Sequence, residues 1–235
     1  LPARVAAIEE CAADVRRVFL KLPGDKRLAF RAGQYIDFLL RGGQRRSFSL
    51  ANAPHDDETL ELHIRHLPGG VFSGYVFGDM QEGALLRFEG PIGNFYLRED
   101  SDRPMILMGG GTGFGPIKGI VEHALHQGVT RPMHIYWGAR AEPDLYLDSL
   151  PRQWAATHET MDYTPVLSEP ASDTQWTGAT GFVHEQVVRD HPDLSGFDIY
   201  MSGPPPMINA AKSAFASAGL PSDRLYYDSF EAAPD

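Results

Sequence analysis

The hydrophobic pattern changes its period near residue 100, and this change limits the possible folds more than any other feature of the sequence. Before that point, short runs alternate apolar and polar residues between turn residues, as antiparallel strands do. These runs are residues 15–22, 35–40, 46–50 and 59–65. After it, apolar runs alternate with helical stretches, as in a parallel sheet. We predict an antiparallel β-barrel over residues 1–100 and an α/β domain over residues 101–235.

The second half repeats one local order, a buried strand followed by a helix. Strands are predicted at residues 104–108, 133–137 and 197–201. Helices are predicted at residues 116–127 and 205–218, the latter with proline at its start. Strands that alternate with helices predict a doubly wound parallel sheet, which binds ligands beyond the carboxyl ends of its strands.

The first of these strands is followed by the glycine-rich segment GGGTGFGP, residues 109–116. Glycines let the backbone approach a pyrophosphate, and the helix N-terminus directs unpaired N–H groups toward it. No lysine follows the glycines, so the segment does not match a P-loop, and ATP hydrolysis fits poorly. A tight turn without a ligand remains the alternative.

Two more strand ends have glycine at the predicted ligand edge. They are WGAR, residues 137–140, and SGPPPM, residues 202–207. Because the carboxyl ends of parallel strands share one edge of a sheet, all three loops should lie together. This arrangement favours one extended ligand, and a dinucleotide fits it.

The barrel half has its own candidate site, the segment Arg46-Ser47-Phe48-Ser49. In a strand, Arg46 and Phe48 lie on one face and the serines on the other. A guanidinium beside an aromatic ring suits a flat, phosphorylated, aromatic ligand. A surface arginine beside a core phenylalanine is the alternative. Residues 69–73 (GGVFS) begin a predicted helix and offer a second phosphate site, which favours FAD over a mononucleotide.

Composition excludes several classes of function. The formal net charge of −10 argues against nucleic acid and anionic membranes as partners. A single cysteine, Cys11, excludes an internal disulfide and an iron–sulfur cluster on this chain, and favours the cytoplasm. We predict no membrane span and no metal site. The chain begins at Leu1 rather than Met, so a fragment of a longer protein, with a neighbouring domain missing, stays an open alternative.

Eight motifs in order resemble the ferredoxin–NADP reductase superfamily, in particular oxygenase reductase components and the CDP-6-deoxy-glucoseen reductases. The resemblance covers nearly the whole chain. The motifs are FRAGQY (30–35), RSFSLANAP (46–54), GGVFSGYV (69–76), GPIGNFYL (90–97), GGGTGFGP (109–116), YWGAR (136–140), SGPPPM (202–207) and YYDSF (226–230).

The resemblance implies a flavin-binding barrel, a nicotinamide-binding domain, and a flavin ring at their junction. Ser49, Ser202 and Phe230 would act at the reacting rings, with Ser49 near flavin N5. The residues expected to bind FAD are Arg46, Ser47, Phe48, Ser49, His63, Ile64, Arg65, Gly70, Val71, Phe72, Ser73 and Phe230. Those expected to bind the nicotinamide dinucleotide are Gly111, Thr112, Gly113, Gly138, Arg140, Ser202, Gly203, Pro204 and Met207.

Two departures from the family pattern bear on this assignment. Phe48 stands where tyrosine is usual, and Ser202 stands where many members have cysteine. We expect NADH rather than NADPH, because Glu142 and Asp144 would repel a 2′-phosphate near Arg140, the one obvious basic partner.

The resulting functional hypothesis is an NADH-dependent flavoprotein reductase. It would transfer a hydride to bound FAD and pass electrons singly to a [2Fe–2S] protein or a fused ferredoxin domain. Two alternatives remain open: a reductase of free flavin, and a flavin-binding electron-transfer subunit without enzymatic activity.

Overall fold

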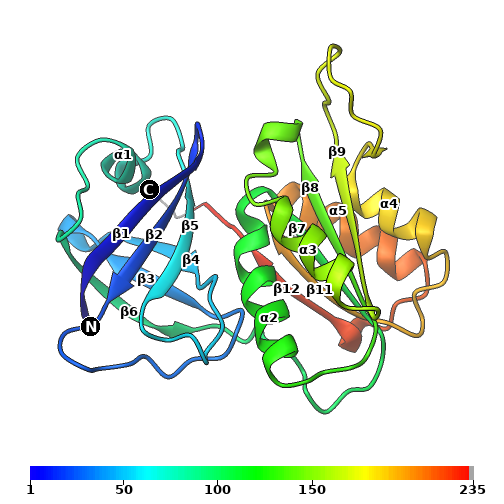
Figure 1. The fold of residues 1–235 in the computed structure, drawn as a ribbon, viewed down its shortest axis with the longest axis horizontal. Coiled ribbons are helices and arrows are strands. Elements are labelled where there is room, and N and C mark those ends of the chain that lie inside the picture. Colours follow the sequence, from blue (N-terminus) through cyan, green and yellow to red (C-terminus); the bar gives the residue numbers. More distant parts are fainter. Residues whose placement is uncertain (233–235) are drawn as a thin grey trace. The chain divides into compact units, whose positions relative to one another are not determined.

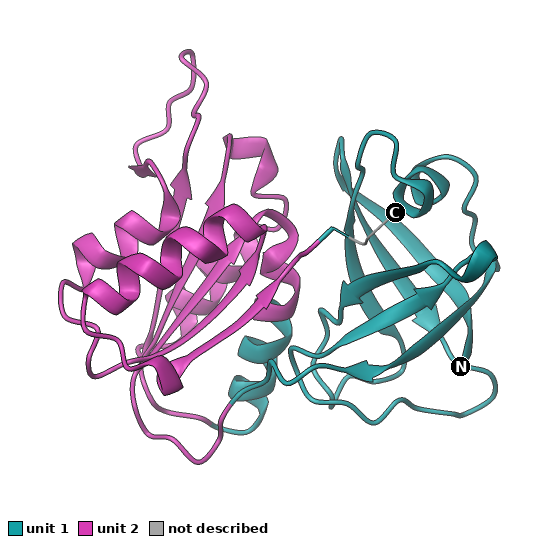
Figure 2. Cartoon of the chain, turned by 180° about the vertical axis from the view of Figure 1, so that it is seen from behind, with its two compact units in different colours: residues 1–97, 118–128, 232–235 teal, residues 98–117, 129–231 magenta. Residues whose placement is uncertain are grey.

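The computed structural model describes residues 1–232 and divides into two compact units (Figure 2). Unit 1 comprises residues 1–97, 118–128 and 232, and unit 2 comprises residues 98–117 and 129–231. Residues 233–235, the end of the predicted second domain, lie outside the described residues. The division does not follow the sequence simply, because one helix begins in unit 2 and its later residues group with unit 1.

Unit 1 is an antiparallel sheet with the strand order β4-β3-β6-β1-β2-β5 (Figure 1). A single bridge between Leu50 and Leu62 joins the two ends of this order, so the sheet closes into a barrel. Its elements are β1 (Pro2–Ala12), β2 (Val15–Lys21), β3 (Tyr35–Leu39), the 3₁₀ turn Arg41–Gly43, β4 (Arg45–Ser49), β5 (Leu60–Arg65), α1 (Val71–Phe77) and β6 (Leu85–Ile92).

The barrel core is built from the alternate residues that point inward along each strand. Leu60, Leu62 and Ile64 on β5 are fully buried, and they pack with Phe38 and Phe88 from β3 and β6. α1 lies against this cluster through Phe72, whose ring stacks on Phe38 at 4.6 Å. The predicted antiparallel barrel is confirmed.

Unit 2 is a six-stranded sheet with the order β10-β9-β8-β7-β11-β12, and all of its strand pairs are parallel. α3 and the start of α2 lie on one face, and α4 and α5 on the other (Figures 1 and 2). Its strands are β7 (Met105–Gly110), β8 (Met133–Ala139), β9 (Met161–Leu167), β10 (Ala179–Thr180), β11 (Asp198–Gly203) and β12 (Leu225–Ser229). Its helices are α2 (Phe114–His126), α3 (Ser149–Thr157), α4 (Val183–Asp190) and α5 (Pro205–Ser217), with 3₁₀ turns at Gly111–Gly113, Glu142–Asp144 and Ser222–Arg224.

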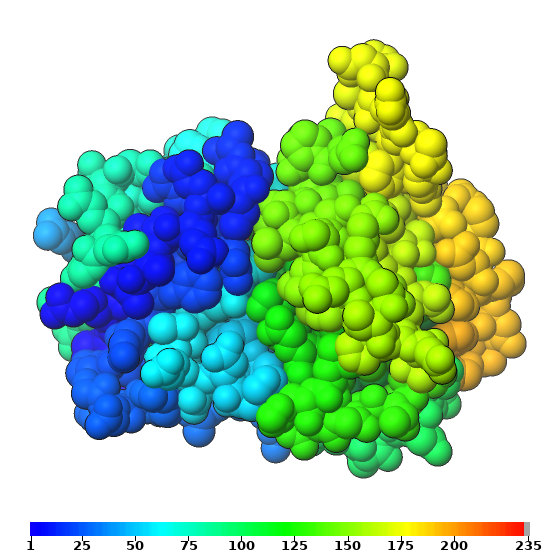
Figure 3. All heavy atoms as spheres, in the orientation of Figure 1, coloured from blue at the N-terminus to red at the C-terminus, as the bar shows by residue number. Residues whose placement is uncertain are grey.

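The predicted parallel sheet is confirmed, with each predicted strand and helix within two residues of its observed bounds. β7, β8 and β11 are the central strands, and their apolar runs are buried on both faces. The segment between β9 and β10 projects from unit 2 (Figure 3). Because β7, β8 and β11 are parallel, the carboxyl ends of these three buried strands lie at one edge of the sheet.

Candidate functional site

The carboxyl edge of unit 2 brings the three glycine-containing loops side by side. In the strand register, Gly110 at the end of β7 pairs with Gly138 on β8. On the other side of β7, Gly109 pairs with Ser202 near the end of β11. The segments predicted to bind a dinucleotide therefore lie at adjacent positions of one edge.

Three glycines at this edge are in contact with the neighbouring loop, leaving no room for a side chain. A Cβ on Gly113 would lie 2.1 Å from the carbonyl oxygen of Ser202, and one on Gly110 would lie 2.4 Å from the sulfur of Met207. Gly203 has φ +151°, and a Cβ on it would lie 2.9 Å from the Cε of Met207. The loops are therefore packed closely against one another, and each of these three positions requires glycine.

Ser202 is the one polar side chain of this edge that is wholly buried, and its hydroxyl has no hydrogen-bond partner among the described residues. A buried hydroxyl without a hydrogen-bond partner is unfavourable unless a ligand supplies the missing hydrogen bond. Next to it, the amide of Phe230 donates to the carbonyl of Gly203 at 2.9 Å. Trp137 donates to the carbonyl of Gly111 at 3.0 Å and so supports the glycine turn from below. The residues present fit a dinucleotide that offers a polar group to Ser202.

The rest of the predicted nucleotide residues are more exposed. Thr112 and Met207 are half-buried, and Pro204 is exposed. Arg140 is exposed, and no carboxylate within residues 1–232 pairs with it. Glu142, which follows it closely, accepts a hydrogen bond from Thr174 at 3.1 Å.

One residue of this edge escaped the sequence analysis. Phe182 directly precedes α4 and exposes 62% of its surface, and its ring stacks on His184. The adjacent Val183 is packed against Gly138, where a Cβ would lie 2.8 Å from its side chain. An exposed aromatic ring beside the predicted dinucleotide loops is a candidate stacking surface. The sequence signal that could have revealed this residue is a phenylalanine directly before the helical segment Val183–Asp190.

In unit 1, the four residues predicted on β4 have different environments. Arg46 is half-buried and donates to the carbonyl of Arg45 at 2.7 Å, and no described carboxylate pairs with it. By contrast, the neighbouring Arg45 forms an ion pair with Glu89. Ser47 is exposed and donates to Asp37 at 2.5 Å, whereas Ser49 is half-buried. The unpaired guanidinium of Arg46 fits an anionic ligand.

Phe48 and the α1 segment are joined by their aromatic rings. Phe48 is half-buried and contacts Phe72 with ring centroids 5.3 Å apart. The hydroxyl of Ser73 accepts from the amide of Leu67 at 3.0 Å and donates to the carbonyl of the same residue at 3.2 Å. Since both Phe72 and Ser73 use their side chains inside the unit, this segment can offer a phosphate only its backbone N–H groups. Gly70 leads into the turn, and the side chain of Val71 is exposed.

The predicted residues of β5 point to both sides of the strand. Ile64 is fully buried in the barrel core, and Arg65 forms an ion pair with Asp14 at 3.0 Å. His63 is 6% exposed, and its Nε2 is 2.8 Å from a carboxylate oxygen of Glu61. Burial lowers the pKa of His63, although hydrogen bonding to Glu61 opposes this effect. The imidazole is therefore neutral near pH 7.

Glu61 belongs to a buried ionic cluster that the sequence did not predict. Arg17 and Lys118 both form ion pairs with it, at 2.8 Å and 3.0 Å. Although burial opposes ionisation, hydrogen bonding to His63 and these charges lower the pKa of Glu61 to about 2. The partners are 44 and 57 residues from Glu61, so no local pattern could connect them.

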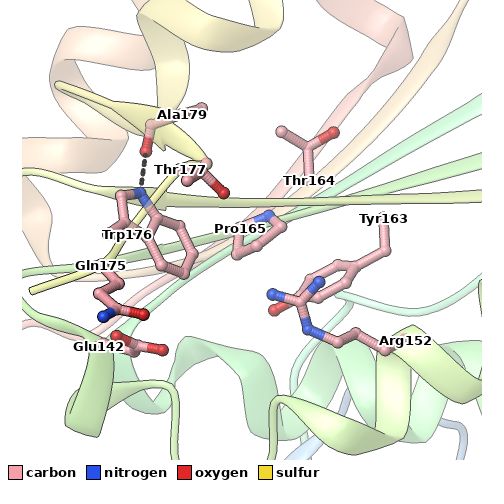
Figure 4. Close-up of a pocket in the computed structure, with 10 residues that line it drawn as sticks. Glu142, Arg152, Tyr163, Thr164, Pro165, Gln175, Trp176, Thr177 and Ala179 are labelled. Atoms are coloured by element: carbon pink, nitrogen blue, oxygen red, sulfur yellow. Dashed lines mark hydrogen bonds between the residues drawn. The ribbon is translucent and has the colours of Figure 1, made fainter.

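A separate cavity of about 360 Å³ lies along β9 in unit 2 (Figure 4). Arg152 and Tyr163 line one side of it, and Trp176 faces Pro165 across the strand and donates to the carbonyl of Ala179 at 3.1 Å. Glu142, expected from the sequence to repel a 2′-phosphate, also lines this cavity, whereas none of the residues predicted to bind a cofactor does. The convergence of the strand ends, rather than the size of a cavity, identifies the candidate site.

Comparison with known families decides the identity of both units. Residues 2–96 match the oxidoreductase FAD-binding domain, and residues 107–213 match the oxidoreductase NAD-binding domain. The chain belongs to the ferredoxin–NADP reductase superfamily. It is an NAD(P)H-dependent oxidoreductase whose cofactors are FAD and a pyridine nucleotide.

Similar proteins extend over almost all of this chain. It is 42% identical over 229 residues to CDP-6-deoxy-L-threo-D-glycero-4-hexulose-3-dehydrase reductase of Yersinia pestis, covering 97% of this chain and 68% of the relative. The naphthalene 1,2-dioxygenase system ferredoxin–NAD(P)⁺ reductase component of Pseudomonas putida is 34% identical, covering 96% and 67%. The structure of the cytochrome P450 reductase GcoB of Amycolatopsis superimposes with a TM-score of 0.90 at 36% identity, covering 98% and 69%.

No group of three or more His, Cys, Asp or Glu side chains in residues 1–232 is placed to hold a metal ion. Over the same residues, none of the helices combines the length and the apolar character that crossing a bilayer requires.

Proposed function

We propose that this chain oxidises NADH and passes the electrons through FAD to a [2Fe–2S] protein or a ferredoxin domain. The observation that supports it best lies at the carboxyl edge of unit 2. There the buried Ser202 hydroxyl has no hydrogen-bond partner within residues 1–232, and the glycines beside it leave no room for a Cβ. When bound, the flavin accepts a hydride from the nicotinamide and releases its electrons one at a time.

We assign FAD to residues 1–100. Arg46 would bind a phosphate because its guanidinium has no carboxylate partner among the described residues. The segment from Gly70 to Ser73 would bind the pyrophosphate through backbone N–H groups. Phe48 and Ser49 would position the flavin ring, with the Ser49 hydroxyl directed toward N5, while Ser47 and the β5 residues His63, Ile64 and Arg65 would flank the cofactor.

We assign the nicotinamide dinucleotide to residues 101–235. Gly111, Thr112 and Gly113 would bind its pyrophosphate at the start of α2, a helix of 13 residues. Ser202 would complete its hydrogen bonding with the nicotinamide amide, and Gly138, Gly203, Pro204 and Met207 would line that pocket. Phe230 would cover the flavin ring. Hydride transfer needs the two rings within about 3–3.5 Å and no acid–base group.

The preference for NADH rests on the surroundings of Arg140. Glu142 and Asp144 lie on the turn that follows it, and they would repel a 2′-phosphate. Phe182 would stack on the adenine from the same edge, since its ring is exposed. The corresponding test compares kcat/KM for NADH and NADPH, and equal values would contradict the assignment.

The acceptor is inferred from related proteins. One relative is named a ferredoxin–NAD(P)⁺ reductase component of an oxygenase system, and another the reductase subunit of an aromatic O-demethylase. We propose that an iron–sulfur protein, separate or fused, takes the electrons from this chain in the cytoplasm.

The deciding experiment is the absorbance spectrum of the purified protein before and after anaerobic addition of NADH and then of NADPH, with the cofactor identified by chromatography. Retained FAD that NADH bleaches supports the proposal. A colourless protein that oxidises NADH only with added flavin would make it a reductase of free flavin. Retained flavin that neither nucleotide reduces would favour an electron-transfer subunit without enzymatic activity.

A matched pair of arginine variants tests the FAD assignment. Arg46→Ala should lose most of its FAD during purification, because a phosphate would lose its charged partner. Arg45→Ala removes the neighbouring arginine, which is exposed and paired with Glu89, and should retain FAD. Equal FAD content in the two variants would contradict the role of Arg46.

A further inference from the structure

Lys118 is a buried lysine on α2 whose ammonium group is fully engaged inside unit 1. It is 5% exposed, and its Nζ donates to Glu61 at 3.0 Å, to Glu122 at 3.0 Å and to the carbonyl of Ala51 at 3.2 Å. Ala51 follows β4 by two residues, so the lysine contacts the chain directly after the predicted flavin strand. Such a group is costly to bury unless its partners are fixed.

Glu61 connects this lysine to His63. One carboxylate oxygen of Glu61 binds Lys118, and the other binds Nε2 of His63 at 2.8 Å. Arg17 on β2 binds that second oxygen as well, at 2.8 Å. The carboxylate therefore already has two permanent cations, and a proton on His63 would add a third positive charge at a buried position.

Charged and titratable groups from three other elements lie around the Glu61 carboxylate of β5. β2 supplies Arg17, and α2 supplies Lys118 and Glu122. Behind Arg17, β1 supplies Glu9 at 2.8 Å and the thiol of Cys11. Burial, Lys118 and Arg17 lower the pKa of His63, whereas its hydrogen bond to Glu61 and the charge of Glu61 raise it.

The position of the helix against this segment is also fixed sterically. Gly119 follows Lys118, and a Cβ there would lie 3.0 Å from the carbonyl oxygen of Asn52. Asn52 in turn accepts a hydrogen bond from the amide of Glu61 at 2.9 Å through its side chain. The lysine therefore meets its carboxylate in a fixed geometry.

We propose that Lys118 is a positioning residue that acts through Glu61 to keep the His63 imidazole neutral and in place beside the flavin. The location of His63 beside the flavin rests on the proposed function, whereas the charge relation between Lys118 and His63 does not. In consequence, the β5 strand does not change its charge across the physiological pH range, and the flavin is shielded from proton uptake next to it.

The first test uses histidine ring NMR signals in the full chain, with His63→Gln to assign the signal of His63. Lys118→Met should increase the proton affinity of His63 by about ten-fold or more. The reason is that Lys118 and His63 bind the same carboxylate, and the loss of a nearby cation shifts a pKa by about one unit or more. Lys118→Arg retains the charge and should leave His63 neutral at the same pH values. Identical titration of His63 in Lys118→Met and the unmodified protein would overturn the proposal.

Two additional variants separate charge from folding. Lys118→Gln keeps a hydrogen-bond donor without the charge, and it replaces Lys118→Met if that protein does not fold. The double variant Glu61→Gln/Lys118→Met removes both charges, and His63 should then remain neutral because its acceptor is no longer an anion. Protonation of His63 at neutral pH in the double variant would overturn the role assigned to Glu61.

The second test measures the flavin midpoint potential of the holoprotein against pH. At high pH, Lys118→Met should lower the potential, because a positive charge near the flavin is lost. As pH falls, protonation of His63 should restore positive charge, so the difference from the unmodified protein should shrink. A constant difference, while NMR shows proton uptake, would overturn the location of His63 beside the flavin and leave the charge relation supported.

Discussion

Each unit buries one carboxylate among several cations, but the two clusters are placed differently relative to the candidate ligand residues. Asp198 is fully buried at the start of β11, with Arg131 at 3.0 Å, Arg103 at 3.3 Å and Arg224 at 3.6 Å. Ser202 lies four residues further on, about 13 Å along the same strand. Glu61, by contrast, is two residues from His63 and bonded to it.

The difference shows two ways of combining a stabilising charged cluster with a ligand site. In unit 2 the charged cluster and the candidate site occupy opposite ends of one strand, so a substitution in the cluster need not alter the site. In unit 1 the buried carboxylate is bonded directly to His63, a residue that we assign to the flavin site. Among the described residues, unit 1 has thirteen Lys and Arg against thirteen Asp and Glu, whereas unit 2 has eight against seventeen. A dinucleotide anion would therefore bind unit 2 through local N–H groups rather than through overall attraction.

The largest expected effect is the loss of the Asp198 charge. Asp198→Asn leaves three arginines without their shared anion, and we expect a loss of about 3–5 kcal/mol in the free energy of unfolding. Denaturant unfolding measures it, and Arg189→Gln is a control from the exposed surface of the same unit. If the separation in unit 2 holds, the remaining folded protein keeps its KM for NADH. A large increase in KM would break the comparison.

The second effect concerns Glu61 and acid. Its pKa falls from 4.5 in the unfolded chain to about 2 in the fold, so its contribution is present above about pH 4.5 and is lost as pH falls toward 2. The shift corresponds to roughly 3 kcal/mol. Glu61→Gln should be less stable at pH 7 and show a flatter loss of stability in acid. Unfolding curves with the same acid slope as the unmodified protein would refute this role.

A smaller effect is expected at Phe182. Phe182→Ala removes a stacking surface but no buried packing, so KM for NADH should increase by a factor of about five to thirty, or about 1–2 kcal/mol. The melting temperature should not change. Phe182→Tyr retains the ring and serves as the control. A destabilised protein with unchanged KM would show that Phe182 stabilises the fold of unit 2 and does not bind NADH.

The smallest effect is expected at Ser202. Ser202→Cys replaces the hydroxyl by a slightly larger thiol, which is a weaker hydrogen-bond donor, at the position that we assign to the nicotinamide pocket, so the turnover number should change by a few-fold, about 1 kcal/mol. FAD content should be unaffected. Rapid-reaction measurement of flavin reduction by NADH follows the step directly. Unchanged reduction kinetics would remove Ser202 from the site.

The sequence predicted the parts of the fold in which the pattern is local. β7, the glycine turn and α2 follow one another without interruption, so their pattern is complete within about twenty residues. β1 was missed because two irregularities in its pairing with β2 interrupt the alternation. β6 was missed because Phe88 is its one buried residue, and Gly90 and Pro91 follow. Tertiary pairing, rather than local sequence, makes these segments strands.

The candidate site shows the same limit. Glycine motifs identified the edge of unit 2, because each motif contains the last residues of its own strand and the loop that follows. The side chains of Phe72 and Ser73, however, are used inside the barrel, which depends on contacts with Phe38 and Leu67. The Glu61 cluster joins β2, β5 and α2, and only the folded chain brings Arg17, Glu61 and Lys118 together. Such pairing cannot be inferred from any single segment.

The outer edge of unit 2 has a consequence for the behaviour of the protein at high concentration. β10 pairs with Val166 and Leu167 alone, so the first five residues of β9 have no described strand on that side. An open edge of this kind can recruit strands from other molecules and begin aggregation. Pro165 has no N–H to offer, and Trp176 of the projecting segment lines the same cavity as Pro165 (Figure 4). Shortening that segment would therefore favour edge-to-edge association, although no predicted ligand residue would be lost.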